Sequence, residues 1–213
     1  MPERSKNIRF SIDPKADLYY NFYTFCIRGD FMSVLLHICC APCSIMCIKS
    51  LREEGLQPVG YWYNPNIHPK LEYKTRRNTL VEYAKTIDRP LILEDEYGLR
   101  SFVRDLCPDF DNRCEYCYRR RMAQTAAYAA ENGFDAFCTT LLISPYQNQE
   151  LLLSVGEEMA SQYGIPFLYR DFRPLFKEGQ QAAQDLELYR QIYCGCIFSE
   201  EERYTNHKKK KGS

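Results

Sequence analysis

The segment that most constrains the fold of this chain is VLLHICCAPC, residues 34–43. Its apolar first half is typical of a buried strand in a parallel sheet, because such strands are covered on both faces and need not alternate. Pro42 lacks an N–H group and suits the first turn of a helix, so the strand should end near Ile38 and a helix should begin just after Cys40. Cys39 and Cys40 would then lie at the carboxyl end of a strand, where open α/β sheets bind ligands.

Predicted strands and helices alternate along the rest of the chain. We expect further strands at 58–63, 91–93, 136–140 and 165–169, and helices at 44–54, 70–85, 99–105, 114–132, 149–163 and 176–188. This alternation indicates βαβ units with right-handed crossovers, and therefore an α/β fold with a parallel sheet. We divide the chain into an N-terminal extension (1–32), an α/β catalytic domain (33–205) and a basic tail (206–213).

Charge and patterning exclude several classes of protein. The 28 basic residues balance 28 acidic ones, so a nucleic-acid partner would have to be held by a local patch. No segment approaches the roughly 20 apolar residues of a membrane span, and the charged N-terminus lacks the apolar core of a signal peptide. We therefore predict a cytoplasmic protein without a membrane partner. No glycine-rich phosphate loop follows the first strand, so the usual binding of ATP or NAD is not expected.

Eleven cysteines in 213 residues are an unusual number. A cytoplasm keeps thiols reduced, so cysteines in close sets favour metal binding or redox chemistry over a disulfide framework. The sets are Cys39, Cys40, Cys43 and Cys47, then Cys107, Cys114 and Cys117, and finally Cys194 and Cys196. We interpret Cys26, Cys47 and Cys138 as small buried hydrophobic residues.

Cys114 and Cys117 form a C-x-x-C motif at the start of a predicted helix. Residues three apart share a helix face, and the positive end of the helix dipole stabilises thiolates. With Cys39 and Cys40 this motif offers four thiolates, which suit a 4Fe–4S cluster or an all-thiolate zinc site. Structural zinc sites usually take two C-x-x-C knuckles, so the vicinal pair favours the cluster and leaves zinc as the alternative.

The sequence Cys194-Gly195-Cys196 is a separate signal. Gly195 permits the tight turn that brings alternate cysteines within disulfide distance. A ring that small would be easily reduced, which suits an electron relay. Two buried thiols, or thiols that bind a metal beside the cluster, are the alternatives. Cys43, one helical turn beyond Cys40, is a candidate ligand for such a second metal.

Polar residues follow the predicted strands at the edge where parallel strands end. The candidate substrate-binding residues among them are Asn64, His68, Gln147, Asn148 and Arg173. Arg76, Arg77 and the arginine run at 119–121 are candidate phosphate contacts, with solvated helix faces as the alternative. Loops of this kind also use Asn and Ser for turn chemistry, so it is their shared edge that indicates a site.

Six blocks of the sequence occur in an order that points to one family. They are HICCAPC, YNPNIHP with E-Y-x-x-R just after it, CEYCYRRRM, TTLLISPYQN, YRDFRPLF and YCGCIFSEEER. Together they resemble the QueH family of epoxyqueuosine reductases, from about residue 34 to residue 203. The resemblance implies a three-layer sandwich like that of the nucleotide α-hydrolases (HUP-like), without a phosphate loop. It also implies reductive deoxygenation of epoxyqueuosine to queuosine at the wobble position of tRNA, with an iron–sulfur cluster in place of cobalamin.

The resemblance also implies roles for individual cysteines. Carried over by motif, the 4Fe–4S ligands are Cys39, Cys40, Cys114 and Cys117, and the redox-active pair is Cys194 with Cys196. Family members can carry an additional iron beside the cluster, here near Cys43. The implied partners are tRNA carrying epoxyqueuosine and an unidentified electron donor.

Two other classes of function are compatible with cysteine sets on an α/β domain. One is a tRNA sulfur-transfer enzyme of the ATP-pyrophosphatase type, which needs the phosphate loop that this chain lacks. The other is a non-catalytic, zinc-stabilised RNA-binding module.

Overall fold

The computed structural model describes residues 32–107 and 109–209, the last four of these by backbone only. They belong to one unit, Phe31–Ser213. The predicted N-terminal extension, except for Met32, lies outside the described residues, as do residues 210–213 of the predicted tail. The proposed domain boundaries therefore stay predictions.

Four parallel strands form the sheet, in the order β3-β2-β1-β4. They are β1 (Ser33–His37), β2 (Gln57–Trp62), β3 (Leu91–Leu93) and β4 (Ala136–Thr139). In the central strand, Leu35 lies opposite Val59 of β2 on one side and Phe137 of β4 on the other. All three side chains are fully buried, because helices cover both faces of the sheet and the strands carry continuous apolar runs. The predicted α/β class with a parallel sheet is confirmed.

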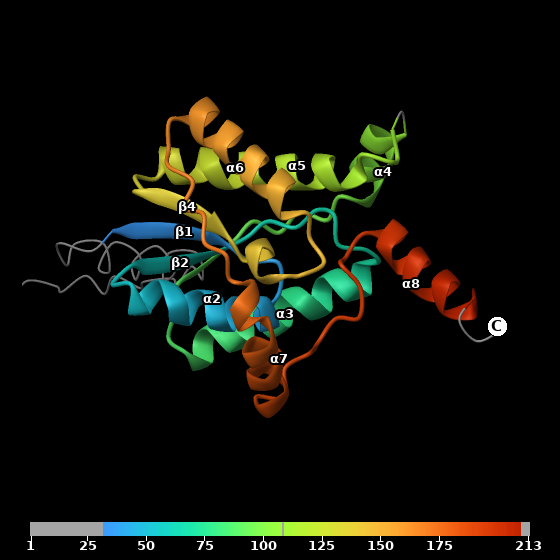
Figure 1. Cartoon of the computed structure of the whole chain (residues 1–213), viewed down its shortest axis with the longest axis horizontal. Coiled ribbons are helices and arrows are strands. Elements are labelled where there is room, and N and C mark those ends of the chain that lie inside the picture. The colour runs from blue at the N-terminus through green and yellow to red at the C-terminus, as the bar shows by residue number, and fades with distance from the viewer. Residues whose placement is uncertain (1–31, 108, 210–213) are drawn as a thin grey trace, which may run out of the picture. The chain divides into compact units, whose positions relative to one another are not determined.

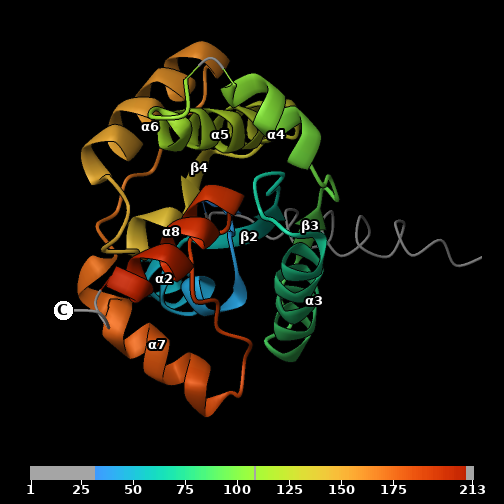
Figure 2. The same ribbon diagram turned by 90° about the vertical axis from the view of Figure 1, so that its right-hand side faces the viewer.

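Helices form a layer on each face of the sheet (Figure 1). On one face lie α5 (Arg113–Glu131) and α6 (Gln149–Tyr163), and on the other α2 (Ala41–Glu53), α3 (Lys70–Thr86) and α7 (Phe176–Asp185). Helices α4 (Leu99–Leu106) and α8 (Ile197–Lys209) lie toward the carboxyl ends of the strands, and Figure 2 shows α8 in front of that edge. Short 3₁₀ helices η1 (Thr140–Ile143) and η2 (Arg173–Leu175) complete the secondary structure of the described residues. Within the described residues, no helix has both the length and the apolarity needed to cross a membrane.

The strand predicted at residues 165–169 was wrong. The structure reduces it to one parallel bridge between Phe137 and Phe167. The amide of Phe137 donates to the Pro166 carbonyl at 3.0 Å, and the amide of Leu168 donates to the Phe137 carbonyl at 2.8 Å. Pro166 cannot donate a ladder hydrogen bond, which limits further pairing.

The last helices also differ from the prediction. Helix α7 ends at Asp185, three residues before the predicted end, and Glu187 has φ of 53°, a conformation that does not continue a right-handed helix. Helix α8 was not predicted, and its backbone continues through Lys209 into the predicted basic tail.

A Gly156→Ala substitution in α6 should destabilise the layer over β4. A Cβ at this position would lie 2.2 Å from a ring carbon of Phe167, so either the ring or the helix must shift. We expect the free energy of unfolding to fall by about 1–3 kcal/mol, the usual cost of overpacking a core. The exposed Ser154→Ala in the same helix is the matched control. Urea unfolding followed by circular dichroism measures both, and equal midpoints would contradict the prediction.

Candidate metal centre

Three cysteines meet where β1 gives way to α2. The sulfurs of Cys39, Cys40 and Cys43 lie within 4.8 Å of one another, and all three residues are buried. The strand ends at His37, and Cys40 is the N-cap of α2, with φ −170° and ψ 161°. The predicted helix start just after Cys40 is therefore confirmed. Because regular strand geometry stops before Cys39, neighbouring cysteines can face one site instead of opposite faces of the sheet.

Hydrogen-bond donors from two other segments approach these sulfurs. Gln191 donates from Nε2 to Cys40 Sγ at 2.9 Å and lies 3.9 Å from Cys43 Sγ. Thr140 Oγ1 lies 3.5 Å from Cys39 Sγ. Hydrogen bonds from the thiols of Cys40 and Cys43 hold the pKa of Cys39 well below its usual value, while hydrogen bonds with Cys39 and Cys40 raise the pKa of Cys43. The arrangement favours the thiolate form of Cys39.

The C-x-x-C motif lies in the first turns of α5, close to the predicted position. Cys117 is buried and Cys114 is exposed. Cys117 shares a small apolar cluster with Phe102, Leu106 and Cys196. The structure thus brings the C-x-x-C motif against the C-terminal cysteine motif, 79 positions further along the chain from Cys117 to Cys196.

Cys194, Gly195 and Cys196 form a tight turn before α8. Gly195 has φ of 146°, which favours glycine, and a Cβ there would lie 3.3 Å from Arg76 Nη1. The His68 amide donates to the Gly195 carbonyl at 2.7 Å. Among the described residues both cysteines of the motif are free thiols, so their pairing as a redox couple stays a prediction.

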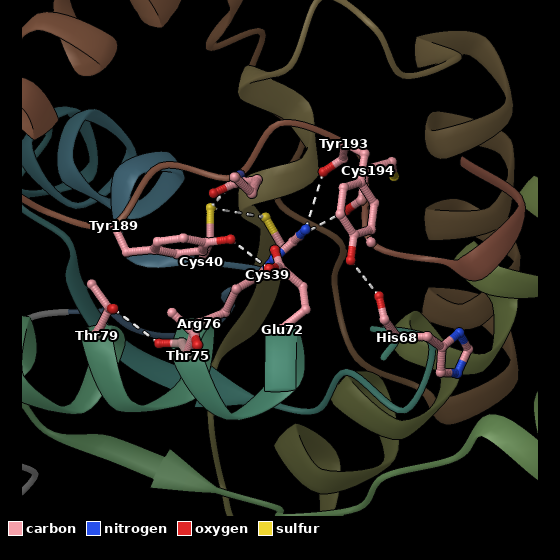
Figure 3. Close-up of polar contacts among 12 residues, drawn as sticks. Cys39, Cys40, His68, Glu72, Thr75, Arg76, Thr79, Tyr189, Tyr193 and Cys194 are labelled. Carbon is pink, nitrogen blue, oxygen red and sulfur yellow. Dashed lines mark hydrogen bonds and ion pairs between the residues drawn. The ribbon is translucent and has the colours of Figure 1, made fainter. Parts of the chain in front are cut away.

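Arg76 anchors this turn from below (Figure 3). Its guanidinium donates from Nη1 to the Cys194 carbonyl at 2.8 Å and from Nη2 to the Tyr193 carbonyl at 3.1 Å. Nε pairs with Glu72 at 2.6 Å, and the Arg76 side chain is only 1% exposed. The sequence predicted a phosphate contact, whereas the structure uses these donors inside the protein. Arg76 is therefore a positioning residue for the C-terminal motif.

Arg121 has a comparable place beside Cys117. The residue is 2% exposed, and its guanidinium donates from Nη2 to Cys117 Sγ at 3.0 Å and from Nε to the Cys117 carbonyl at 3.1 Å. Burial lowers the pKa of Arg121, whereas the thiols of Cys117, Cys194 and Cys39 raise it. The thiols outweigh the burial, so the pKa of Arg121 is raised. One buried guanidinium thus contacts Cys117 of α5 and interacts electrostatically with Cys39, which follows β1, and with Cys194 of the C-terminal motif.

The structure does not bring all the predicted substrate residues to the cysteines. Gln147 lies at the site, since its Nε2 is 3.5 Å from Cys194 Sγ and its Oε1 accepts from Tyr118 at 2.7 Å. Asn148 instead caps α6, accepting from the Leu151 amide at 3.1 Å. Arg173 pairs with Asp171 on the surface.

Two further candidates are buried in the structure. Asn64 donates to the Ile38 carbonyl at 2.9 Å and lies 3.2 Å from His37 Nε2. His68 packs against Phe102 and Tyr97, and burial lowers its pKa to about 4, so its ring is neutral near pH 7. The backbone of His68, through Gly195 and Tyr193, is what supports the C-terminal motif.

The arginine run at 119–121 also makes contacts within the protein, although only Arg121 is buried. Arg119 pairs with Glu115 and Glu158, and Arg120 pairs with Glu96. The sequence offered a signal for the role of Arg121, because residues four apart share a helix face and Arg121 follows Cys117 by four. Gln191 and Thr140 had no comparable signal, since each reaches its cysteine from a distant segment.

Comparison with known proteins shows the family of this chain. Residues 34–202 match the family model described as "QueH: Epoxyqueuosine reductase QueH". A protein of that name from Dehalococcoides mccartyi is 37% identical over 171 residues, which cover 80% of this chain and 94% of that protein. One from Thermotoga maritima is 34% identical over 188 residues, covering 82% and 94%.

A solved structure shares the fold. It is a predicted subunit of a tRNA methyltransferase from Methanocaldococcus jannaschii, which aligns with a TM-score of 0.52 at 14% identity and covers 86% of this chain and 89% of that chain. At this identity the likeness concerns the fold alone. The family model and the sequence relatives carry the assignment, and the chain belongs to the QueH family of epoxyqueuosine reductases.

Proposed function

We propose that this protein reduces epoxyqueuosine to queuosine at the wobble position of tRNA, with a 4Fe–4S cluster held by Cys39, Cys40, Cys114 and Cys117. The family supplies the substrate. The observation that supports the cluster most is Arg121, a buried cation that donates to Cys117 Sγ and whose charge is favoured by thiols of all three motifs. A cofactor whose thiolate ligands carry negative charge fits beside this buried cation.

The side chains present fit an iron–sulfur group. An all-sulfur donor set suits iron–sulfur clusters and zinc alike. The reaction requires electrons, however, and zinc has no redox chemistry of its own. Donors to the sulfurs, such as Gln191 on Cys40 and Arg121 on Cys117, are the outer partners that tune metal sites. Cys43, whose sulfur lies within 4.8 Å of those of Cys39 and Cys40, would be the ligand for an additional iron.

The overall reaction is a two-electron, two-proton reduction. Both C–O bonds of the epoxide break, a C=C bond forms, and the oxygen leaves with two protons as water. When bound, the cluster would supply single-electron transfer and a Lewis-acidic iron. The thiols of Cys194 and Cys196 can release two electrons and two protons as their S–S bond forms, so their oxidation balances one turnover. An external reductant then restores the dithiol.

The protein's own residues hold this relay in place. Arg76 and the backbone of His68 fix the turn from Tyr193 to Gly195. Gln147 lies between Cys194 and Tyr118 and is the predicted substrate residue nearest to the relay. Its amide can exchange the contact with sulfur for one with a hydroxyl of the substrate.

The direct test is anaerobic reconstitution with iron and sulfide, followed by incubation with epoxyqueuosine-containing tRNA. We expect a brown protein with visible absorbance that converts the nucleoside to queuosine. Iron-free, zinc-loaded protein should be colourless and inactive. Normal turnover by the zinc form would refute the cluster.

A Cys194→Ser variant tests the relay. Serine cannot form the S–S bond, so we expect multiple turnover to be abolished while bound iron stays at the wild-type level. Cys107→Ser makes the same chemical change at an exposed thiol and should keep full activity. If Cys194→Ser turns over at the wild-type rate, the relay role is wrong.

A further inference from the structure

Arg121 differs from the other paired arginines in what offsets its charge. Within the part of the chain that the structure describes, no carboxylate forms an ion pair with it, whereas carboxylates pair with Arg76, Arg77, Arg104, Arg113, Arg119, Arg120, Arg170 and Arg173. A buried charge without an opposite charge costs several kcal/mol. The groups that favour its charge are instead thiols, above all Cys117. The negative charge that offsets Arg121 would therefore be a thiolate, above all that of Cys117.

The geometry directs this charge onto one sulfur. Cys117 and Arg121 lie one turn apart on α5, and Nε is held by the Cys117 carbonyl at 3.1 Å while Nη2 reaches Cys117 Sγ at 3.0 Å. The other donors to the proposed cluster ligands are neutral: Gln191 lies 2.9 Å from Cys40 Sγ and Thr140 lies 3.5 Å from Cys39 Sγ. Charge-assisted hydrogen bonds are about twice as strong as neutral ones.

A fixed cation beside a ligand sulfur acts differently on two oxidation states. Each electron added to an iron–sulfur cluster adds one negative charge, and a nearby positive charge stabilises the more negative state more strongly. Hydrogen bonds to the sulfurs and net charge are among the factors that set cluster potentials. Burial keeps the charge of Arg121 from being screened by solvent ions.

We propose that Arg121 raises the reduction potential of the cluster by serving as its buried counter-charge at Cys117. This inference rests on the proposed function, since it requires the cluster. It assigns Arg121 a positioning role: the residue does not touch the substrate but makes the cluster easier to reduce.

Anaerobic redox titration of the reconstituted full chain, followed by electron paramagnetic resonance, tests the proposal. At the wild-type midpoint we expect Arg121→Met to lower the ratio of reduced to oxidised cluster at least about tenfold, which is about 59 mV for a one-electron couple. Arg121→Lys keeps the charge and loses the fork geometry, so its ratio should fall less. Arg120→Met is the matched control, because that side chain is 28% exposed and pairs with Glu96.

The outcomes separate this proposal from the proposed function. If reconstituted wild-type protein binds neither iron nor sulfide, both the proposed function and the role of Arg121 are contradicted. Full cluster in wild type and in Arg121→Met, with the same midpoint, overturns the role of Arg121 and leaves the proposed function intact. If the methionine variant does not hold a cluster, Arg121→Gln keeps a donor at this position without the charge. A glutamine midpoint equal to wild type overturns the proposal, and a tenfold lower ratio supports it.

Discussion

A Cys40→Ala variant is expected to lose its bound iron and its activity. Cys40 Sγ lies in the buried group with Cys39 and Cys43 and accepts a hydrogen bond from Gln191. Removal of a direct ligand should lower the affinity for the metal by more than the roughly 10–100-fold that follows the loss of a hydrogen-bond partner of a ligand. Iron and sulfide analysis of anaerobically reconstituted protein, together with visible absorbance, measures the effect.

Cys47→Ala is the matched control for this variant. Cys47 is fully buried in α2, only seven positions from Cys40, but it does not belong to the group of three sulfurs. We expect full iron loading and a loss of about 1 kcal/mol in the free energy of unfolding, because only a small buried group is removed. Wild-type iron content in Cys40→Ala would contradict the assignment of this ligand.

An Arg76→Met variant should be strongly destabilised. The substitution leaves the carbonyls of Tyr193 and Cys194 without their donor, and it leaves the Glu72 carboxylate with Tyr189 but without its cation. Breaking a buried pair by removing one partner costs about 3–5 kcal/mol, and we expect a loss of that size in the free energy of unfolding. Arg76→Lys should restore little of it, because a lysine lacks the planar fork that reaches three acceptors.

The adjacent Arg77 provides the control for this prediction. Its side chain is 24% exposed and pairs with Asp95, and exposed pairs contribute at most about 1 kcal/mol. Arg77→Met should therefore unfold close to the wild-type urea midpoint. Equal midpoints for the Arg76 and Arg77 variants would show that Arg76 does not support the C-terminal motif.

The central part of the fold could be predicted from the sequence. The uninterrupted apolar run before His37 and the proline at position 42 identify the first strand and the start of the next helix, because both signals are local. The strand expected at 165–169 fails for a reason that lies in its pairing: Pro166 has no N–H, and only Phe137 and Phe167 form a bridge. Pairing with a distant strand is not visible in a local pattern.

The site was predictable to a similar extent. Spacing of cysteines identified the motifs, and the structure brings Cys117 and Cys196 into one cluster. The arginines could not be assigned, because a sequence does not show whether a helix face is solvated or faces a buried thiol. Arg76 and Arg121 both resembled surface phosphate contacts, and both lie almost fully inside the protein.

The groups around the proposed centre come from three segments that are far apart in the chain: the turn at residues 39–43, the start of α5, and residues 191–196. The last of these segments follows every strand of the sheet. A polypeptide whose synthesis has not reached residue 191 lacks Gln191 and both relay thiols, even if its sheet has already formed. All four proposed cluster ligands lie within residues 39–117. A nascent chain that stops before residue 191 therefore carries the ligands without the dithiol that would renew the electrons, and only the later segment makes the centre able to turn over.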